Sequence, residues 1–202
     1  MRKFAGPDLV LASHNAGKLR ETDELLRPYG YSVKSAAEFN LEEPEETEDT
    51  FIGNARIKAH FAAKATGLPA LSDDSGIEID ALGGAPGVYT ADWAETPDGR
   101  DFTLAMTRAW DELEALDAAH PRTCRFCCTL CLAWPDGHDE IFEGKVEGHF
   151  TWPMSGQFGF GFDPIFTPLG KSQTFGEMDP AEKHAMSHRA VAFAKLVEGC
   201  LA

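Results

Sequence analysis

Two adjacent carboxylates follow a short apolar stretch in the segment Leu71-Ser72-Asp73-Asp74-Ser75-Gly76. Residues 69–72 predict one strand and the alternating residues 77–80 a second, so that the acidic pair would lie at a strand end, in the turn of a hairpin. Neighbouring residues on extended chain point to opposite sides, which predicts different roles for Asp73 and Asp74. A carboxylate at a strand end can bind Mg²⁺ or activate water, but the same residue types are common in ordinary turns.

The composition is that of an acidic globular protein. The chain has 202 residues with 18 Lys and Arg against 33 Asp and Glu, a net charge of −15. We expect residues 1–202 to form a single domain of two lobes without a linker. The charge argues against a nucleic acid polymer as partner, because affinity for such polymers comes largely from Lys and Arg. A small anionic ligand can still bind at a local cluster of cations.

The sequence carries no signal for membrane insertion or export. No apolar run approaches the roughly 18 residues that a membrane helix needs. Near the N-terminus, Leu9-Val10-Leu11-Ala12 is too short for the core of a signal peptide and predicts a strand instead. We therefore expect a cytoplasmic protein that does not associate with membranes.

Four of the five cysteines form two C-x-x-C pairs, a spacing that can mark a zinc site: Cys124, Cys127, Cys128 and Cys131. Residues 123–134, however, are β-branched, aromatic and aliphatic, which predicts a buried strand. In a strand, residues three apart face opposite ways, so the four thiols would not converge. We expect small buried side chains here, with neither zinc nor a disulfide.

Strands and helices alternate along the chain. Strands are predicted at residues 8–12, 31–35, 123–134 and 140–150, and helices at 19–26, 50–66, 101–116 and 187–199, with a further helix beginning at Asp179-Pro180. This order predicts an α/β fold: a long mixed sheet with flanking helices, in two lobes around a central active-site cleft.

The first chemical motif, Ser13-His14-Asn15-Ala16-Gly17-Lys18, joins the first predicted strand to the first helix. Backbone N–H groups at a helix start favour anions, and Lys18 adds a positive charge. The spacing of a Walker loop is absent. An acidic loop, residues 41–49, follows further along the chain. Its Glu45 and Glu46 are either a solvated charge run or, if the fold returns them to Asp74, part of an Mg²⁺ site.

Two further motifs lie in the C-terminal part of the chain. In residues 158–164, aromatic side chains separated by glycines could stack on a base or simply be tucked into the core. Lys183 precedes Ser187-His188-Arg189, where two cationic residues occupy the first turn of a helix. The helix dipole disfavours cations there, which indicates either a functional site or a solvated corner between two helices.

Taken in order, five motifs resemble the inosine/xanthosine triphosphate pyrophosphatase family over nearly the whole chain. They are Ser13 to Lys18, Ser72 to Gly76, Ala81 to Tyr89, Gly159 to Phe166 and Ser187-His188-Arg189. The resemblance implies Mg²⁺-dependent hydrolysis of ITP, dITP and XTP to the monophosphate and pyrophosphate, by a homodimer. This sequence departs from the family pattern at His14 and Ala190, where glycine is common.

The resemblance also implies roles for individual residues. Asp74 would be the proton acceptor and a metal ligand, with Glu45 or Glu46 as a further ligand. Substrate contacts would come from Ser13, His14, Asn15, Ala16, Gly17, Lys18, Ser75, Phe160, Gly161, Phe162, Asp163, Lys183, His188 and Arg189. His188 and Arg189 would donate to the 6-oxo group of the purine. A pyrophosphatase with another base preference, and a nucleotide sensor without turnover, remain as alternative hypotheses.

Overall fold

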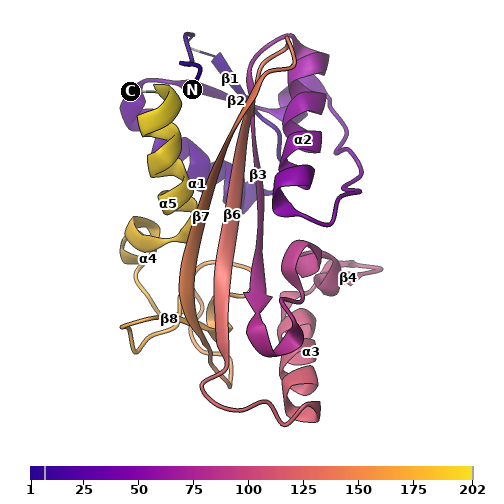
Figure 1. Cartoon of the computed structure of the whole chain (residues 1–202), viewed down its shortest axis with the longest axis vertical. Coiled ribbons are helices and arrows are strands. Elements are labelled where there is room, and N and C mark those ends of the chain that lie inside the picture. Colours follow the sequence, from indigo (N-terminus) through magenta and orange to yellow (C-terminus); the bar gives the residue numbers. More distant parts are fainter. Residues whose placement is uncertain (7, 202) are drawn as a thin grey trace. The chain divides into compact units, whose positions relative to one another are not determined.

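The computed structural model describes residues 1–6 and 8–201 as an α/β protein (Figure 1). The strands are β1 (Asp8–Leu11), β2 (Ser32–Ser35), β3 (Ala70–Ile79), β4 (Glu95–Thr96), β5 (Gly99–Arg100), β6 (Thr123–Ala133), β7 (Asp139–Phe150) and β8 (Phe166–Pro168). The α-helices are α1 (Ala16–Leu26), α2 (Phe51–Thr66), α3 (Phe102–Ala115), α4 (Pro180–Met186) and α5 (His188–Leu196). The predicted helices and strands are confirmed, apart from the hairpin discussed below and small shifts at element ends.

Six strands form one sheet in the order β2-β1-β3-β6-β7-β8, and β4 pairs with β5 separately. The sheet is mixed, since β1 is parallel to β2 and β3 while β7 and β8 are antiparallel. The predicted mixed sheet with flanking helices is therefore confirmed. Among residues 1–6 and 8–201, no helix combines the length and apolar character that crossing a bilayer requires.

The chain divides into two compact units, and β3, β6 and β7 contribute residues to both. Unit 1 comprises Met1–Asp74, Cys128–Gly144 and Arg189–Ala202, and unit 2 comprises Ser75–Cys127 and Lys145–His188. In unit 1, α1 and α5 cover one face of the sheet and α2 the other (Figure 1). The alternation of β1 reflects this: Leu9 and Leu11 pack with α1 and α5, and Val10 packs with the alanines of α2.

Local sequence explains the limits of these helices. Thr50 caps α2 by accepting from the Gly53 N–H, and Gly67 ends the helix in the left-handed conformation at φ 70°. Asp101 caps α3 through two N–H groups, and Asp179 caps α4 with Pro180 in the first turn. The three helix starts agree with the limits predicted from the sequence.

The predicted hairpin at the acidic pair is wrong. β3 runs without a break from Ala70 to Ile79, so Asp73 and Asp74 lie in the middle of a strand. Gly76 lies within this strand and is not among the glycines with positive φ. Turn propensity alone gives the wrong local structure here. Asp is uncommon in strands and costly to bury, but both carboxylates find cationic partners inside the fold, as described below.

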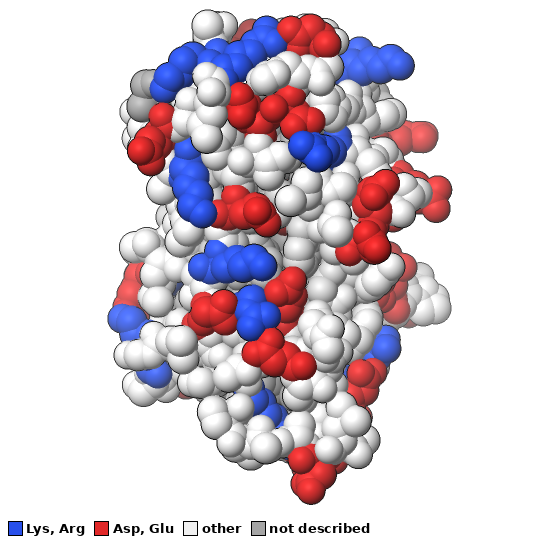
Figure 2. Space-filling model, viewed as in Figure 1, with Lys and Arg blue, Asp and Glu red and all other residues white. Residues whose placement is uncertain are grey.

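The cysteine strand is confirmed as β6, and all five cysteines are buried free thiols. Cys128 belongs to the core beside α1 and α5, and Cys131 to the core beside α2, as alternation along a strand requires. On the face shown in Figure 2, Lys and Arg are interspersed with Asp and Glu instead of forming a continuous basic surface.

The core of unit 2 supplies a stability test in α3. Leu113 is fully buried, whereas Leu116, three residues later, is 60% exposed. We expect Leu113→Ala to lower the free energy of unfolding by about 2–5 kcal/mol, because it leaves a cavity. The control Leu116→Ala should change it by less than about 0.5 kcal/mol. Urea unfolding followed by circular dichroism measures both, and equal losses would contradict the packing described for α3.

Candidate functional site

Asp74 of β3 and Glu46 of the acidic loop meet at one cation, Lys58 of α2. The Lys58 Nζ atom lies 2.7 Å from Asp74 Oδ1 and 2.9 Å from Glu46 Oε1, and it also donates to the Asp73 carbonyl at 3.2 Å. Lys58 is 4% exposed and Asp74 5% exposed. The fold therefore does bring the acidic loop to Asp74, through the contact of Glu46 with Lys58; both Glu45 and Glu46 are exposed.

Sequence reasoning missed Lys58, although a signal was present. Ala55, Ala59 and Ala62 mark the buried face of α2, and Lys58 lies on that same face at helical spacing. A lysine within an apolar stripe must either extend to solvent or find an anionic partner inside the protein. Burial alone would lower the pKa of Lys58, but Asp74 and Glu46 raise it above its ordinary value.

The second oxygen of Asp74 is available for a ligand. Among the described residues, Asp74 Oδ2 is buried and has no hydrogen-bond partner. Burial raises the pKa of Asp74 above its ordinary value, with a further contribution from Glu46, although Lys58 and Lys18 act in the opposite direction. A buried polar oxygen without a partner is costly, so this atom is a natural place for a water molecule or a cation.

The donor set fits Mg²⁺. Asp74 and Glu46 supply carboxylate oxygens, the ligand type that Mg²⁺ prefers, and Mg²⁺ is usually held by one or two carboxylates together with phosphate oxygens. No cluster of three or more His, Cys, Asp or Glu side chains suited to a metal occurs within residues 1–6 and 8–201. These residues therefore suit a metal that arrives with a phosphate ligand better than a metal held by protein alone.

Asp73 contacts a different set of groups from Asp74, as the alternation of side chains predicted. Its carboxylate accepts from Arg189 Nε at 2.7 Å and lies 2.7 Å from Lys18 Nζ. Cys128 Sγ also donates to it, at 3.3 Å. Burial by itself would raise the pKa of Asp73, but the charges of Arg189 and Lys18 outweigh it and hold that pKa well below the ordinary range.

Arg189 is bound to carboxylates. Besides Asp73, its guanidinium contacts Glu21 of α1, and its side chain is 3% exposed. Its donation to a base stays a prediction, and its bonds to carboxylates were not foreseen in the sequence. The physical reason is charge: the buried Asp73 needs a cation, and a bidentate guanidinium satisfies it well.

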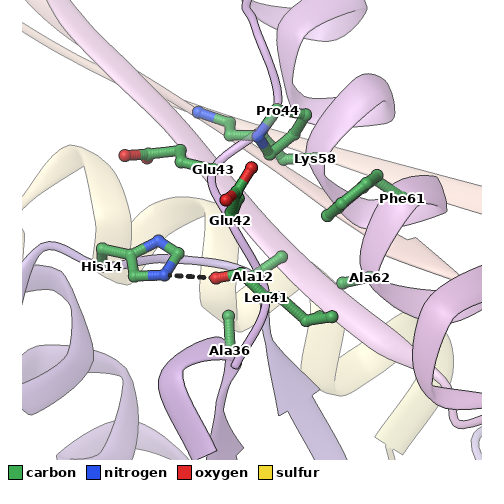
Figure 3. A pocket seen from close by; sticks show the side chains of 10 residues that line it. All are labelled: Ala12, His14, Ala36, Leu41, Glu42, Glu43, Pro44, Lys58, Phe61 and Ala62. Atoms are coloured by element: carbon green, nitrogen blue, oxygen red, sulfur yellow. Dashed lines mark hydrogen bonds between the residues drawn. The ribbon is translucent and has the colours of Figure 1, made fainter. Parts of the chain in front are cut away.

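The loop Ser13 to Lys18 is more self-contained than the sequence indicated. Asn15 caps α1, and its Oδ1 accepts from the N–H groups of Gly17 and Lys18 at 2.9 and 3.1 Å. The Asn15 N–H donates to Ser13 Oγ. Three of the backbone donors expected to face an anion are thus bonded within the loop. Ala16 is exposed, and the His14 ring lies against the acidic loop, bonded to the Leu41 carbonyl (Figure 3).

Unit 2 holds the other predicted residues, organised around Asp163. This carboxylate is 2% exposed and accepts from Lys183 Nζ at 2.6 Å and from the Phe160 N–H at 2.7 Å. Gly159 has φ +75°, and a Cβ there would lie 2.0 Å from Asp163 Oδ2, so only glycine fits. Lys183 Nζ also lies 5.0 Å from the centroid of the Phe160 ring.

Phe162 and His188 are both buried. Phe162 is 1% exposed and packs in the core of unit 2, and its contact with a base stays a prediction. Gly161 beside it takes φ +65° and continues the loop. His188 is buried and stacks on Phe126, with 4.8 Å between ring centroids and 12° between planes. Phe126 was not singled out in the sequence because it lies within an apolar strand.

The predicted residues thus fall into two sets. Unit 1 holds Ser13 to Lys18, Glu45, Glu46, Asp74 and Arg189, and unit 2 holds Ser75, Phe160 to Asp163, Lys183 and His188. Two peptide bonds connect the sets directly, from Asp74 to Ser75 and from His188 to Arg189. A family model described as the Ham1 family matches residues 9–199, which include every one of these residues.

The chain belongs to the Ham1 family. Curated relatives named dITP/XTP pyrophosphatase include one from Ruegeria pomeroyi, 66% identical over 98% of both chains. Another, from Agrobacterium fabrum, is 58% identical over 100% of this chain and 99% of its own. A solved HAM1 protein from Coxiella burnetii matches with TM-score 0.88 and 39% identity, covering 96% of this chain and 98% of its own. The Ham1 assignment agrees with the resemblance drawn from the motifs.

The buried pair of Asp73 and Arg189 gives this Ham1 protein a testable pH dependence. Asp73→Asn leaves the Arg189 charge without its main partner, and we expect a loss of about 3–5 kcal/mol of unfolding free energy at neutral pH. The pKa of Asp73 is lowered in the folded state. Its contribution is therefore fully present above the unfolded value of about 3.9 and is lost as pH falls through the lower folded value.

Denaturant unfolding of wild type and Asp73→Asn between neutral and acidic pH measures this difference. The difference in unfolding free energy between the two proteins should become smaller only below about pH 4. The exposed Asp98 provides the control Asp98→Asn, whose unfolding free energy should equal that of wild type at every pH. A difference that stays constant down to strongly acidic pH would contradict the assigned ion pair.

Proposed function

We propose that this chain hydrolyses non-standard purine nucleoside triphosphates, dITP, ITP and XTP, to the monophosphate and pyrophosphate with Mg²⁺ as cofactor. Membership of the Ham1 family supports the proposal, as do full-length relatives named dITP/XTP pyrophosphatase. The observation that carries it is Asp74, whose Oδ1 is fixed by Lys58 while its buried Oδ2 has no partner among the described residues.

In this mechanism Asp74 accepts the proton of the attacking water at Oδ2. Lys58 holds the carboxylate in place through Oδ1, so that the second oxygen keeps a fixed direction. A raised pKa makes Asp74 a better base than an ordinary aspartate, because efficiency in proton transfer improves as the pKa approaches the working pH. Mg²⁺, when bound at Asp74 and Glu46, would offset negative charge on the phosphates.

Lys18 supplies the positive charge for the triphosphate. It is bound to Asp73 at 2.7 Å and its side chain is 16% exposed, so its amine is restrained near the surface of unit 1. Phosphoryl transfer depends mainly on positioning and charge compensation, and a restrained ammonium serves both. Backbone donors of the Ser13 to Lys18 loop would contribute only where a phosphate displaces the bonds made by Asn15.

The base would be bound by Ser75, Phe160, Lys183 and His188, as the family resemblance implies. An aromatic face such as that of Phe160 suits stacking on a purine. A donor facing the 6-oxo group would meet a donor in adenine, and an unpaired buried donor costs about 1–3 kcal/mol. We propose His188 and Arg189 for this donor role, shared with backbone N–H groups; the guanidinium of Arg189 is also bound to Asp73 and Glu21. We further propose a cytoplasmic homodimer, as the family resemblance implies.

The test of this function is pyrophosphate release from dITP, XTP, dATP, dGTP and dTTP, each with Mg²⁺ and with EDTA. We expect rapid, Mg²⁺-dependent release from dITP and XTP and little from the others. Preferred hydrolysis of dTTP would favour a pyrophosphatase of different base preference. Binding of dITP without any release would favour a nucleotide sensor instead.

The role of Asp74 gives a second prediction. Asp74→Asn keeps the shape of the side chain but removes the base and most of its affinity for Mg²⁺, so kcat should fall by about 10²- to 10⁴-fold. The exposed Asp98→Asn serves as the matched control and should retain full activity. Circular dichroism confirms folding of both variants, and turnover close to wild type in Asp74→Asn would remove Asp74 from the mechanism.

A further inference from the structure

The acidic loop is an irregular segment that carries Glu46. Residues 41–48 form neither helix nor strand. Leu41 lies at its start, where its N–H donates to the Ala36 carbonyl at 3.2 Å. At its middle, Glu46 meets Lys58 with a side chain that is 33% exposed. A partly exposed ion pair contributes little by itself, so the position of Glu46 depends on how the rest of the loop is held.

His14 holds the start of the loop. Its Nε2 lies 2.9 Å from the Leu41 carbonyl oxygen, and because a carbonyl can only accept, Nε2 carries the proton. Figure 3 shows the ring pointing across a small pocket toward Leu41, with Glu42 and Glu43 following along the loop. The bond thus connects the Ser13 to Lys18 loop with the acidic loop.

Asn54 holds the end of the loop. Its Oδ1 accepts from the Glu48 N–H at 3.0 Å, and the side chain is 2% exposed. Gly53 beside it permits the contact, since a Cβ at that position would lie 2.5 Å from Glu48 Cβ. Asn54 and Lys58 are four residues apart on α2, so the same helical face that anchors the loop also presents the ammonium to Glu46.

We propose that His14 is a positioning residue: together with Asn54 it fixes the two ends of the acidic loop and thereby holds Glu46 beside Lys58 and Asp74. The inference rests on the proposed function, in which Glu46 and Asp74 share Mg²⁺. The tether needs a side chain at position 14 that carries an N–H donor and is long enough to reach the Leu41 carbonyl.

The first experiment measures the tether without any catalysis. Hydrogen exchange of the metal-free protein, read by mass spectrometry on peptides covering residues 42–48, compares wild type with His14→Ala. Losing the tether should loosen the loop, so that the Glu48 amide, which donates to Asn54 Oδ1, exchanges about 2- to 10-fold faster. His14→Gln retains an N–H donor and should restore part of the protection. The exposed His120 gives the control His120→Ala, for which we expect wild-type exchange.

The second experiment measures the Mg²⁺ dependence of pyrophosphate release from dITP. A loosely held Glu46 should raise the Mg²⁺ concentration for half-maximal rate by about 2- to 10-fold in His14→Ala, by the same reasoning. The comparison is made at saturating dITP, so that a change in the Mg²⁺ dependence is read separately from any change in the maximal rate. For His14→Gln, the Mg²⁺ concentration for half-maximal rate should lie between the values for wild type and His14→Ala.

Unchanged exchange in His14→Ala would overturn the proposal, because the loop would then not depend on the tether. Faster exchange with an unchanged Mg²⁺ dependence would also overturn it, since the loop position would not matter for Glu46. A fall in kcat at saturating Mg²⁺ without a shift in Mg²⁺ dependence would also contradict the proposal. It would indicate that His14 contacts the substrate directly. Failure of the proposed function is distinguishable: wild type would then release no pyrophosphate from any substrate, whatever the exchange shows.

Discussion

Charge compensation on both sides of β3 is the constraint on which the site depends. A strand inside a sheet can carry two adjacent carboxylates only if each finds a cation, because an isolated buried charge is prohibitively costly. Asp73 is compensated by Lys18 and Arg189, and Asp74 by Lys58. Three segments far apart in the sequence, α1, α2 and the start of α5, are thereby fixed around one strand.

The same compensation separates the two aspartates in their chemistry. Arg189 and Lys18 lower the pKa of Asp73, which stays ionised as a structural anchor. Burial raises the pKa of Asp74, and one of its oxygens has no partner among the described residues. Two identical side chains, one peptide bond apart, are thus prepared for different tasks, and only the second is suited to take a proton or a cation.

Particular residues show where sequence reasoning succeeded and where it failed. The helix starts near Thr50, Asp101 and Asp179 were predicted because they depend on a few neighbouring residues. The hairpin at Asp73 was wrong because turn propensity is weak against buried ion pairs formed with distant helices. The burial of Phe162 could not be read from the sequence, because an aromatic between glycines has the same pattern whether it faces a ligand or the core.

The sequence by itself determined the elements, the motifs and the family, since these follow from local propensity, periodicity and ordered residue patterns. Only the tertiary structure decided which charges meet. Lys58 became a partner of Asp74 and Glu46 because α2 packs its alanine face on the sheet, and Arg189 was committed to Asp73 and Glu21 for the same kind of reason. Such pairings depend on the packing of whole elements, and no local stretch of sequence encodes the direction in which a side chain finally points.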